Sequence, residues 1–162
     1  MSMRYYFLLL LFFCGGIPQI VKAEEVLHVP RFVTIKSETA NMRTGPGKRY
    51  PIKWEITRKG IPVEVISEFE QWRKIRDFQG EEGWVFQTML SGARAVVIQS
   101  KAQILRKSDS ASSRPVAKLE VGVVAKLRSC TKEWCNVEKD ELKGWLPRTS
   151  VWGVYPNESV NR

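Results

Sequence analysis

Three cysteines and one histidine are the side chains of this 162-residue chain best suited to nucleophilic or metal chemistry. His28 lies far along the chain from Cys130 and Cys135, and no serine motif or cluster of metal ligands accompanies them. A cysteine nucleophile needs a nearby base, and two cysteines without a histidine make at most half of a zinc site. We therefore expect no catalytic residues, no metal site and no cofactor.

The six tryptophans offer binding chemistry instead. Side chains alternate across a β-strand, so if Ile75 faces a core, Trp72 faces outward. The same argument applies to Trp84, Trp134 and Trp145, each of which lies close to an aliphatic residue. Two interpretations stay open: the rings pack under loops or between domains, or they line a groove for an extended peptide or a sugar.

The N-terminus has the pattern of a secretory signal peptide. Arg4 precedes an apolar run over residues 5–13, and Val21 and Ala23 are small residues placed as a cleavage site requires. An uncleaved membrane anchor needs about 20 apolar residues, and glycine and proline interrupt this run, as at Pro18. We predict cleavage after Ala23 and a periplasmic or secreted protein.

The cysteines fit that location. Cys14 follows Phe13, whereas a lipid-attachment cysteine normally follows a small residue, so Cys14 is expected to leave with the signal. Cys130 and Cys135 remain in a compartment where a disulfide can persist. One disulfide is the natural expectation.

The charge of the chain limits its partners. The formal charge is +9, and loss of Arg4 and Lys22 with the signal leaves 24 basic against 17 acidic residues, or +7. An exported basic protein meets cell-wall carboxylates, acidic proteins and anionic headgroups. We expect no nucleic-acid partner and at most peripheral membrane contact, with a surface that merely aids solubility as the alternative.

The remaining chain repeats one pattern twice. An offset of 62 residues aligns Ala40 with Ala102, Gly60 with Gly122, and Trp72 with Trp134; after one deletion, an offset of 61 aligns Gly83-Trp84-Val85 with Gly144-Trp145-Leu146. Matches in this order indicate two copies of one module.

Each copy is rich in β-branched and aromatic residues and is cut by turn residues at short spacing, which predicts an all-β fold. Strands are expected near residues 32–37, 52–57, 61–68, 72–77 and 83–86, and in the second copy near 95–99, 116–119, 123–129, 135–138 and 144–146. The short connection 91–94 predicts that the two domains touch.

The segment Ala40-Asn41-Met42-Arg43-Thr44-Gly45-Pro46-Gly47 resembles the opening of bacterial SH3-like domains, in which an Asn-aliphatic-Arg strand enters a Gly-Pro-Gly loop. Residues 71–75 and 83–85 are similar to later landmarks of that family. The resemblance implies two tandem small SH3-like β-barrels, with a signal peptide at 1–23, an N-terminal tail at 24–31, barrel 1 at 32–91, barrel 2 at 94–153 and a C-terminal tail at 154–162.

The second copy departs from the family pattern at the loop. Residues 106–112 replace the Gly-Pro-Gly loop, and Ser112 stands opposite Tyr50. Residues 144–151 instead resemble the segment of eukaryotic SH3 domains in which a proline, here Pro147, lies beside the peptide groove. Within this frame Cys130 and Cys135 flank the turn of a hairpin, where a disulfide would join neighbouring strands.

The resemblance implies a non-enzymatic binding module for peptidoglycan stem peptides or another extended peptide of the bacterial envelope. The alternative is an envelope adaptor or structural subunit that binds a partner protein, and in either case we expect a monomer. The candidate ligand-binding residues are Tyr50, Trp72, Trp84, Lys48, Arg49 and Lys53, and those of a second groove are Trp134, Trp145 and Pro147.

Two further residues of the motif are expected to act locally. Asn41 can hydrogen-bond to the backbone of the loop. Arg43 is expected to pair with a carboxylate such as Glu68 or Glu70.

Overall fold

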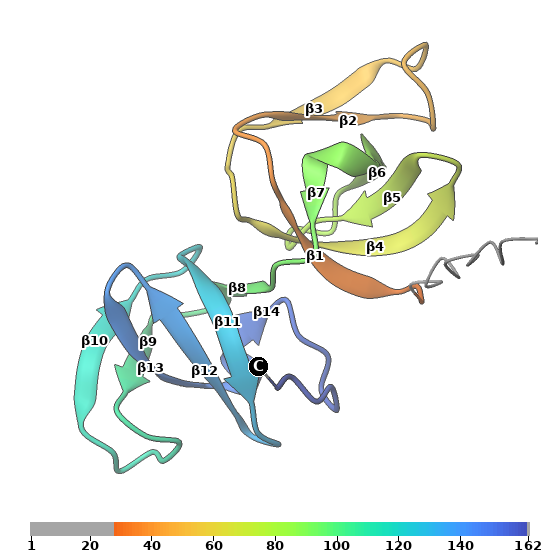
Figure 1. The fold of residues 1–162 in the computed structure, drawn as a ribbon. Helices are drawn as coiled ribbons and strands as arrows, with labels where there is room; N and C mark the ends of the chain where they lie inside the picture. Colours follow the sequence, from red (N-terminus) through yellow and green to blue (C-terminus); the bar gives the residue numbers. More distant parts are fainter. Residues whose placement is uncertain (1–27, 162) are drawn as a thin grey trace, which may run out of the picture.

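The computed structural model describes residues 28–161, which form two β-barrels in sequence (Figure 1). The predicted signal peptide, its cleavage site and Cys14 lie outside the described residues. Within residues 28–161, no helix is long and apolar enough to cross a membrane.

Barrel 1 is a seven-stranded antiparallel sheet in the order β3-β2-β6-β5-β4-β1-β7. Its elements are β1 (Arg31–Ile35), β2 (Ala40–Arg43), β3 (Ile52–Ile56), β4 (Pro62–Phe69), β5 (Trp72–Arg76), β6 (Glu82–Phe86), the 3₁₀ helix η1 (Gln87–Met89) and β7 (Leu90–Ser91).

Barrel 2 repeats this order as β10-β9-β13-β12-β11-β8-β14. Its elements are β8 (Ala95–Ile98), β9 (Gln103–Arg106), β10 (Pro115–Leu119), β11 (Val124–Cys130), β12 (Trp134–Lys139), β13 (Leu142–Pro147), the 3₁₀ helix η2 (Arg148–Ser150) and β14 (Val151–Trp152). The predicted all-β fold of two tandem barrels is confirmed. The short strands β7, β9 and β14 were absent from the strands expected, and β2 was expected only through the resemblance to bacterial SH3-like domains.

The alignment of the two copies needs one correction. Arg43 pairs with Trp84 and Arg106 pairs with Trp145, so the offset at β2 and β9 is 63 and not 62. Ser113, and not Ser112, therefore holds the position of Tyr50. The offset changes in the two turns that follow β3 and β5, where removal of one residue leaves the strand pairing intact.

Each barrel has its own apolar core. Barrel 1 packs aliphatic residues that alternate along its strands, including Met42, Val65 and Ile75, all at most 1% exposed. Barrel 2 packs Leu105, Leu127 and other residues in the same way. The alternation that predicted the strands therefore also fills the two interiors.

The barrels contact each other through aromatic and charged residues. Phe32 of β1 is 7% exposed and lies 4.9 Å from Trp152 and 4.6 Å from Tyr155, measured between ring centroids. Arg94, in the connection between the barrels, lies over the Phe32 ring. Tyr155 also donates a hydrogen bond to Glu64 of β4, at 2.9 Å. Barrel 1 is therefore in contact with Trp152 of β14, with Tyr155 beyond that strand, and with Arg94 of the connection.

The residues after β14 return to barrel 2. Val160 forms an isolated β-bridge with Cys130 and is 8% exposed within the core of that barrel. Glu158 pairs with Arg94. Burial acts to raise the pKa of Glu158, but hydrogen bonds from Arg94 and from the Tyr155 N–H outweigh it, so the pKa lies below its ordinary value. This segment is held at both barrels.

Candidate functional site

Barrel 1 carries an open cavity of about 430 Å³ on the outer face of its sheet. The cavity lies where β2, β5, β6 and η1 meet. Its lining residues are Thr39, Asn41, Arg43, Lys48, Trp72, Phe86, Thr88 and Met89. We call it the barrel 1 cavity.

Trp72 and Phe86 form the aromatic wall of this cavity. They are direct cross-strand partners on β5 and β6, with ring centroids 5.3 Å apart in an edge-to-face arrangement. Trp72 lies on the face opposite Ile75, as the alternation predicted, yet it is only 9% exposed. Trp72 therefore packs against its neighbours and also borders a cavity. Both interpretations that the sequence left open, packing and a groove, apply to this ring.

Arg43 and Lys48 give the cavity a basic side. Arg43 Nη1 donates to the carbonyl oxygens of Tyr50 (2.8 Å) and Lys48 (3.2 Å). Its expected pairing with Glu68 or Glu70 is wrong, because β2 places it beside the loop that follows it and Glu68 pairs with Arg73 instead.

Asn41 is exposed. Among residues 28–161 its side chain makes no hydrogen bond, so its expected bond to the loop backbone is absent.

Tyr50 lies on the loop and outside the cavity. A Cβ atom at Gly45 would stand 2.5 Å from the Tyr50 ring, and one at Gly47 would stand 3.3 Å from it. The ring therefore covers both glycines, and the guanidinium of Arg49 lies 5.1 Å from its centroid. The structure thus separates Tyr50 and Arg49 from Trp72, with which the sequence grouped them.

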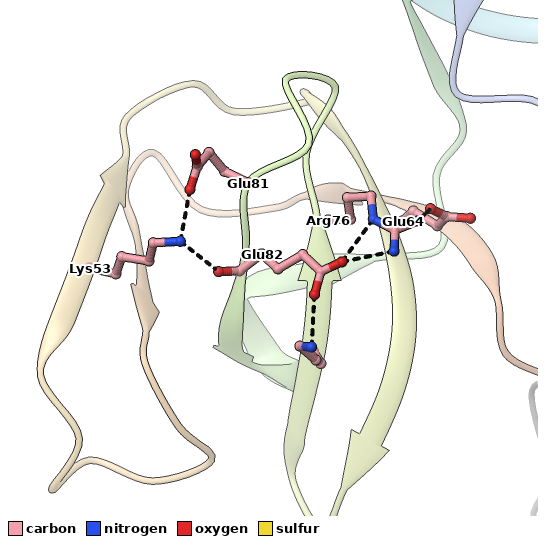
Figure 2. Close-up of polar contacts among 6 residues, drawn as sticks. Lys53, Glu64, Arg76, Glu81 and Glu82 are labelled. Atoms are coloured by element: carbon pink, nitrogen blue, oxygen red, sulfur yellow. Dashed lines mark hydrogen bonds and ion pairs between the residues drawn. The ribbon is translucent and has the colours of Figure 1, made fainter.

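Trp84 and Lys53 also lie outside the cavity lining. Trp84 is half-buried between its strand partners Arg43 and Lys74. Lys53 donates to the Glu81 carboxylate at 2.7 Å and to the Glu82 carbonyl oxygen at 3.3 Å (Figure 2). An acidic ligand would compete with Glu81 for Lys53.

A network of ion pairs continues across this face of barrel 1 (Figure 2). The Glu82 carboxylate accepts from Lys74 and Arg76, and Arg76 also pairs with Glu64. Hydrogen bonds from Lys74 and then Arg76 hold the pKa of Glu82 below its ordinary value, and the bond from Lys53 does the same for the pKa of Glu81. The carboxylates of Glu64, Glu81 and Glu82 thus already form ion pairs within barrel 1.

Barrel 2 has a larger cavity, of about 580 Å³. It lies between the β11–β12 hairpin, η2 and the C-terminal segment. Its lining residues are Lys132, Glu133, Trp134, Pro147, Arg148, Thr149, Val151, Val154 and Pro156. Trp134 and Pro147, two residues of the predicted second groove, are therefore brought together, whereas Trp145 lies outside this lining.

Arg148 builds the wall shared by this cavity and the C-terminal segment. It is 8% exposed, and its guanidinium donates to the carbonyl oxygens of Pro156 and Glu158. Its backbone N–H donates to the Glu133 carbonyl oxygen at 2.8 Å. This role of Arg148 could not be predicted from the repeat, because the C-terminal segment that Arg148 binds has no counterpart after barrel 1.

The predicted disulfide between Cys130 and Cys135 is confirmed. The two residues are direct partners on β11 and β12, with Cα atoms 4.1 Å apart. Residues 28–161 contain no group of three or more His, Cys, Asp or Glu side chains that could hold a metal ion.

Sequence reasoning missed part of the barrel 1 cavity. Phe86, Thr88 and Met89 were not proposed as site residues. The available signal was the strand pairing: Trp72 lies three residues before Ile75 and Phe86 three residues after Gly83, so an antiparallel pair that sets Ile75 opposite Gly83 also sets Trp72 opposite Phe86.

Comparison with solved structures finds distant likenesses. NlpC2 from Trichomonas vaginalis is 6% identical, with a TM-score of 0.37 over 81% of this chain and 51% of that one. NlpC1 from the same organism is 8% identical, with a TM-score of 0.36 over 86% and 51%. An NlpC/P60 family protein from Bacillus cereus is 14% identical, with a TM-score of 0.34 over 75% and 55%. The chain spans about half the length of each, and likenesses this distant carry no conclusion about activity.

No curated protein matches the chain. The family model for the bacterial SH3 domain matches it twice, over residues 36–92 and 99–153. The first range covers β2 to β7 and the second covers β9 to β14, so each begins just after the first strand of its sheet, and together they cover more than half of the sequence. The chain belongs to the bacterial SH3 domain family.

Proposed function

We propose that the chain is an exported, non-catalytic binding module of the bacterial envelope, and that the barrel 1 cavity holds an extended peptide such as the stem peptide of peptidoglycan. Family membership supports binding over catalysis. The pattern of residues 1–23 and the Cys130–Cys135 disulfide support a location outside the reducing cytosol.

The observation that carries this proposal is the composition of the barrel 1 cavity. Trp72 and Phe86 give it a flat apolar wall, and Asn41, Thr88 and Lys48 surround that wall with polar groups. Such sites bind by burying apolar parts of a ligand while a few polar groups fix its orientation. An extended peptide, with alternating side chains and free backbone groups, suits this arrangement.

The charge around the cavity favours an acidic peptide. Arg43 is held by loop carbonyl oxygens, so its charge stays beside the cavity, and Lys48 is exposed. The free carboxylates of cell-wall peptides would be attracted to these two cations. Lys53 is a weaker candidate because Glu81 already pairs with it.

Sedimentation with purified sacculi tests the proposal. Phe86→Ala removes one half-buried ring from the cavity wall and is preferred to Trp72→Ala, since the nearly covered Trp72 also stabilises the sheet. We expect Phe86→Ala to lower the fraction of protein that sediments with sacculi at least about fivefold, a loss of about 1 kcal/mol in binding free energy.

Pro147→Ala is the matched control, because Pro147 holds the position of Phe86 in barrel 2. It should sediment like the wild type. If the wild type stays in the supernatant, wall binding is wrong. If Pro147→Ala alone abolishes sedimentation, the site lies in the barrel 2 cavity.

A further inference from the structure

The edge strand β3 is the least protected strand of barrel 1. It stands at one end of the sheet order, so one side of its backbone has no neighbouring strand within residues 28–161. Ile52 is 50% exposed and Trp54 is 54% exposed. In Figure 1 the β2–β3 hairpin projects at the end of barrel 1 away from barrel 2. An open edge with exposed apolar side chains is a surface for pairing with another strand.

The corresponding edge of barrel 2 is protected. β10 stands at the same end of its sheet, and it carries Pro115 and the exposed Lys118. Proline cannot donate to a neighbouring strand, and β3 has Ile52 at the position of Pro115. The difference between the two edges therefore singles out β3.

The sequence of β3 is complementary to itself when reversed. It reads Ile52-Lys53-Trp54-Glu55-Ile56. In an antiparallel pair of two such strands centred on Trp54, isoleucine faces isoleucine, tryptophan faces tryptophan, and each lysine faces a glutamate. Opposite charges and apolar residues in directly facing positions stabilise strand pairs. We propose that β3 is a homodimerisation edge, which pairs with β3 of a second copy of this chain about a two-fold axis at Trp54.

The charged side chains of β3 are available for this pairing. Glu55 is exposed, and within residues 28–161 its carboxylate has no ion-pair or hydrogen-bond partner. Lys53 uses two of the three donors of its ammonium group, on Glu81 and on the Glu82 carbonyl oxygen (Figure 2). One donor of each Lys53 is left for Glu55 of the other copy.

The edge is short, and the dimer it makes is weak. The register between β2 and β3 skips Lys53, which is a bulge, so the regular ladder spans only a few residues. Five residues bury much less than the roughly 1,200 Å² of a stable interface. Dimerisation then depends on protein concentration. It departs from the monomer expected from the sequence and is independent of the barrel 1 cavity.

Sedimentation equilibrium with the full chain tests the proposal. The wild type should show a reversible rise in average mass between about 10 μM and 1 mM protein, the range in which weak complexes form. Lys53→Glu and Glu55→Lys should each weaken self-association at least about tenfold, because each sets like charges opposite each other. Far-ultraviolet circular dichroism shows that each variant is folded.

Two combinations make the test specific for this register. The double variant Lys53→Glu/Glu55→Lys restores opposite charges and should dimerise like the wild type. A mixture of the two single variants should form a heterodimer, since one presents carboxylates wherever the other presents ammonium groups. Glu81→Gln removes the carboxylate that pairs with Lys53 but keeps an oxygen that can accept from the Trp54 indole N–H, and it should leave dimerisation intact.

The proposal is overturned if the wild type stays monomeric at every concentration, or if it dimerises but neither single variant affects the dimer. It is also overturned if both single variants are monomeric and neither the double variant nor the mixture recovers association.

Discussion

The two barrels share one strand order but hold the same loop by different chemistry. In barrel 1 the loop 44–51 closes with a hydrogen bond from the Thr44 N–H to the Pro51 carbonyl oxygen, and in barrel 2 the loop 107–114 closes in the same way from Lys107 to Arg114. An arginine, Arg43 or Arg106, donates to a carbonyl oxygen inside each loop. The backbone of the loop is therefore conserved between copies although its sequence is not.

The side chains inside the loop differ between the two barrels at three positions that contact one another. Barrel 1 lays the Tyr50 ring over Gly45 and Gly47. At these positions barrel 2 has Ser113, Ser108 and Ser110, and the Ser113 hydroxyl accepts hydrogen bonds from the Ser108 N–H and hydroxyl at 2.9 Å. A ring needs glycines beneath it, whereas serines can support the same turn through hydrogen bonds.

The tip of the β4–β5 hairpin shows a second exchange. Glu68 and Arg73 are direct strand partners in barrel 1 and form an ion pair with Nε and Oε1 3.0 Å apart. Their counterparts in barrel 2 are Cys130 and Cys135. At this position of the hairpin, barrel 1 thus has a partly exposed ion pair and barrel 2 has a disulfide.

A row across three strands is reversed in charge. Glu64, Arg76 and Glu82 lie side by side on β4, β5 and β6, where barrel 2 has Lys126, Glu138 and Lys143. The comparison teaches that strand pairing and the alternation of core residues define this fold, while outward positions can change together as long as each set remains complementary.

The largest effect is expected where the two barrels meet. Phe32→Ala removes a buried ring that contacts Trp152 and Tyr155, and it should destabilise the chain by about 3 kcal/mol. Loss of this contact should also uncouple the barrels, so that calorimetry shows two unfolding transitions in place of one. A single transition with unchanged midpoint would show that the barrels do not stabilise each other.

Removing the disulfide is expected to have the next largest effect. Cys130→Ser/Cys135→Ser should cost barrel 2 about 2 kcal/mol, the value for a short loop. Glu68→Ala/Arg73→Ala removes the ion pair between these two residues and also that of Glu68 with Arg31, and it should still cost barrel 1 less, about 1 kcal/mol, because partly exposed ion pairs contribute little. Denaturant unfolding of both variants measures the two losses.

A disulfide introduced into barrel 1 tests whether the two hairpin tips have the same geometry. Glu68→Cys/Arg73→Cys places two cysteines at the register of the natural pair and should form a disulfide in barrel 1. Failure to oxidise, judged by thiol titration, would mean that the two hairpin tips are not equivalent.

A smaller effect is expected from mixing the two loop chemistries. Gly45→Ser places a Cβ atom against the Tyr50 ring and should cost about 1 to 2 kcal/mol. Adding Tyr50→Ser removes the ring and should recover part of that loss, which gives a favourable coupling energy in a double-mutant cycle. If the stability losses of Gly45→Ser and Tyr50→Ser simply add, the two positions are not coupled, and the idea that they change together is wrong.

The smallest effect is expected from acid. Since the pKa of Glu158 is lowered in the folded chain, its contribution to stability is present above its ordinary value of 4.5 and is lost as the pH falls through the folded value. A carboxyl carbon NMR titration should show the Glu158 midpoint below 4.5, and Glu158→Gln should reduce the loss of stability in acid. A midpoint at or above 4.5 would contradict the role given to Arg94.

The sequence predicted the fold better than the site. The repeat of Gly-Trp-aliphatic and the alternation around Ile75 predicted two all-β copies, because core residues of a strand alternate by rule. The resemblance of residues 40–47 to bacterial SH3-like domains implied that each copy is a barrel. Tyr50 and Trp72 were grouped because both are aromatic and near the loop. Their separation depends on the Tyr50 ring folding onto its own glycines, a local contact that strand periodicity does not encode.

The interface between the barrels was likewise predicted only as a contact. Phe32 belongs to β1, where barrel 2 has Ala95, so the repeat gave no pattern to follow. The C-terminal segment has no counterpart either, and its docking through Arg148 and Val160 rests on side chains that look ordinary in the sequence.

Binding of a peptide in the barrel 1 cavity can be measured by NMR titration of the full chain with a soluble stem peptide. We expect the largest amide shift changes at Asn41, Lys48 and Thr88, together with a shift of the Trp72 indole N–H, and we expect Phe86→Ala to abolish them. Shift changes that gather at Trp134 and Thr149, or that survive Phe86→Ala undiminished, would contradict binding in this cavity.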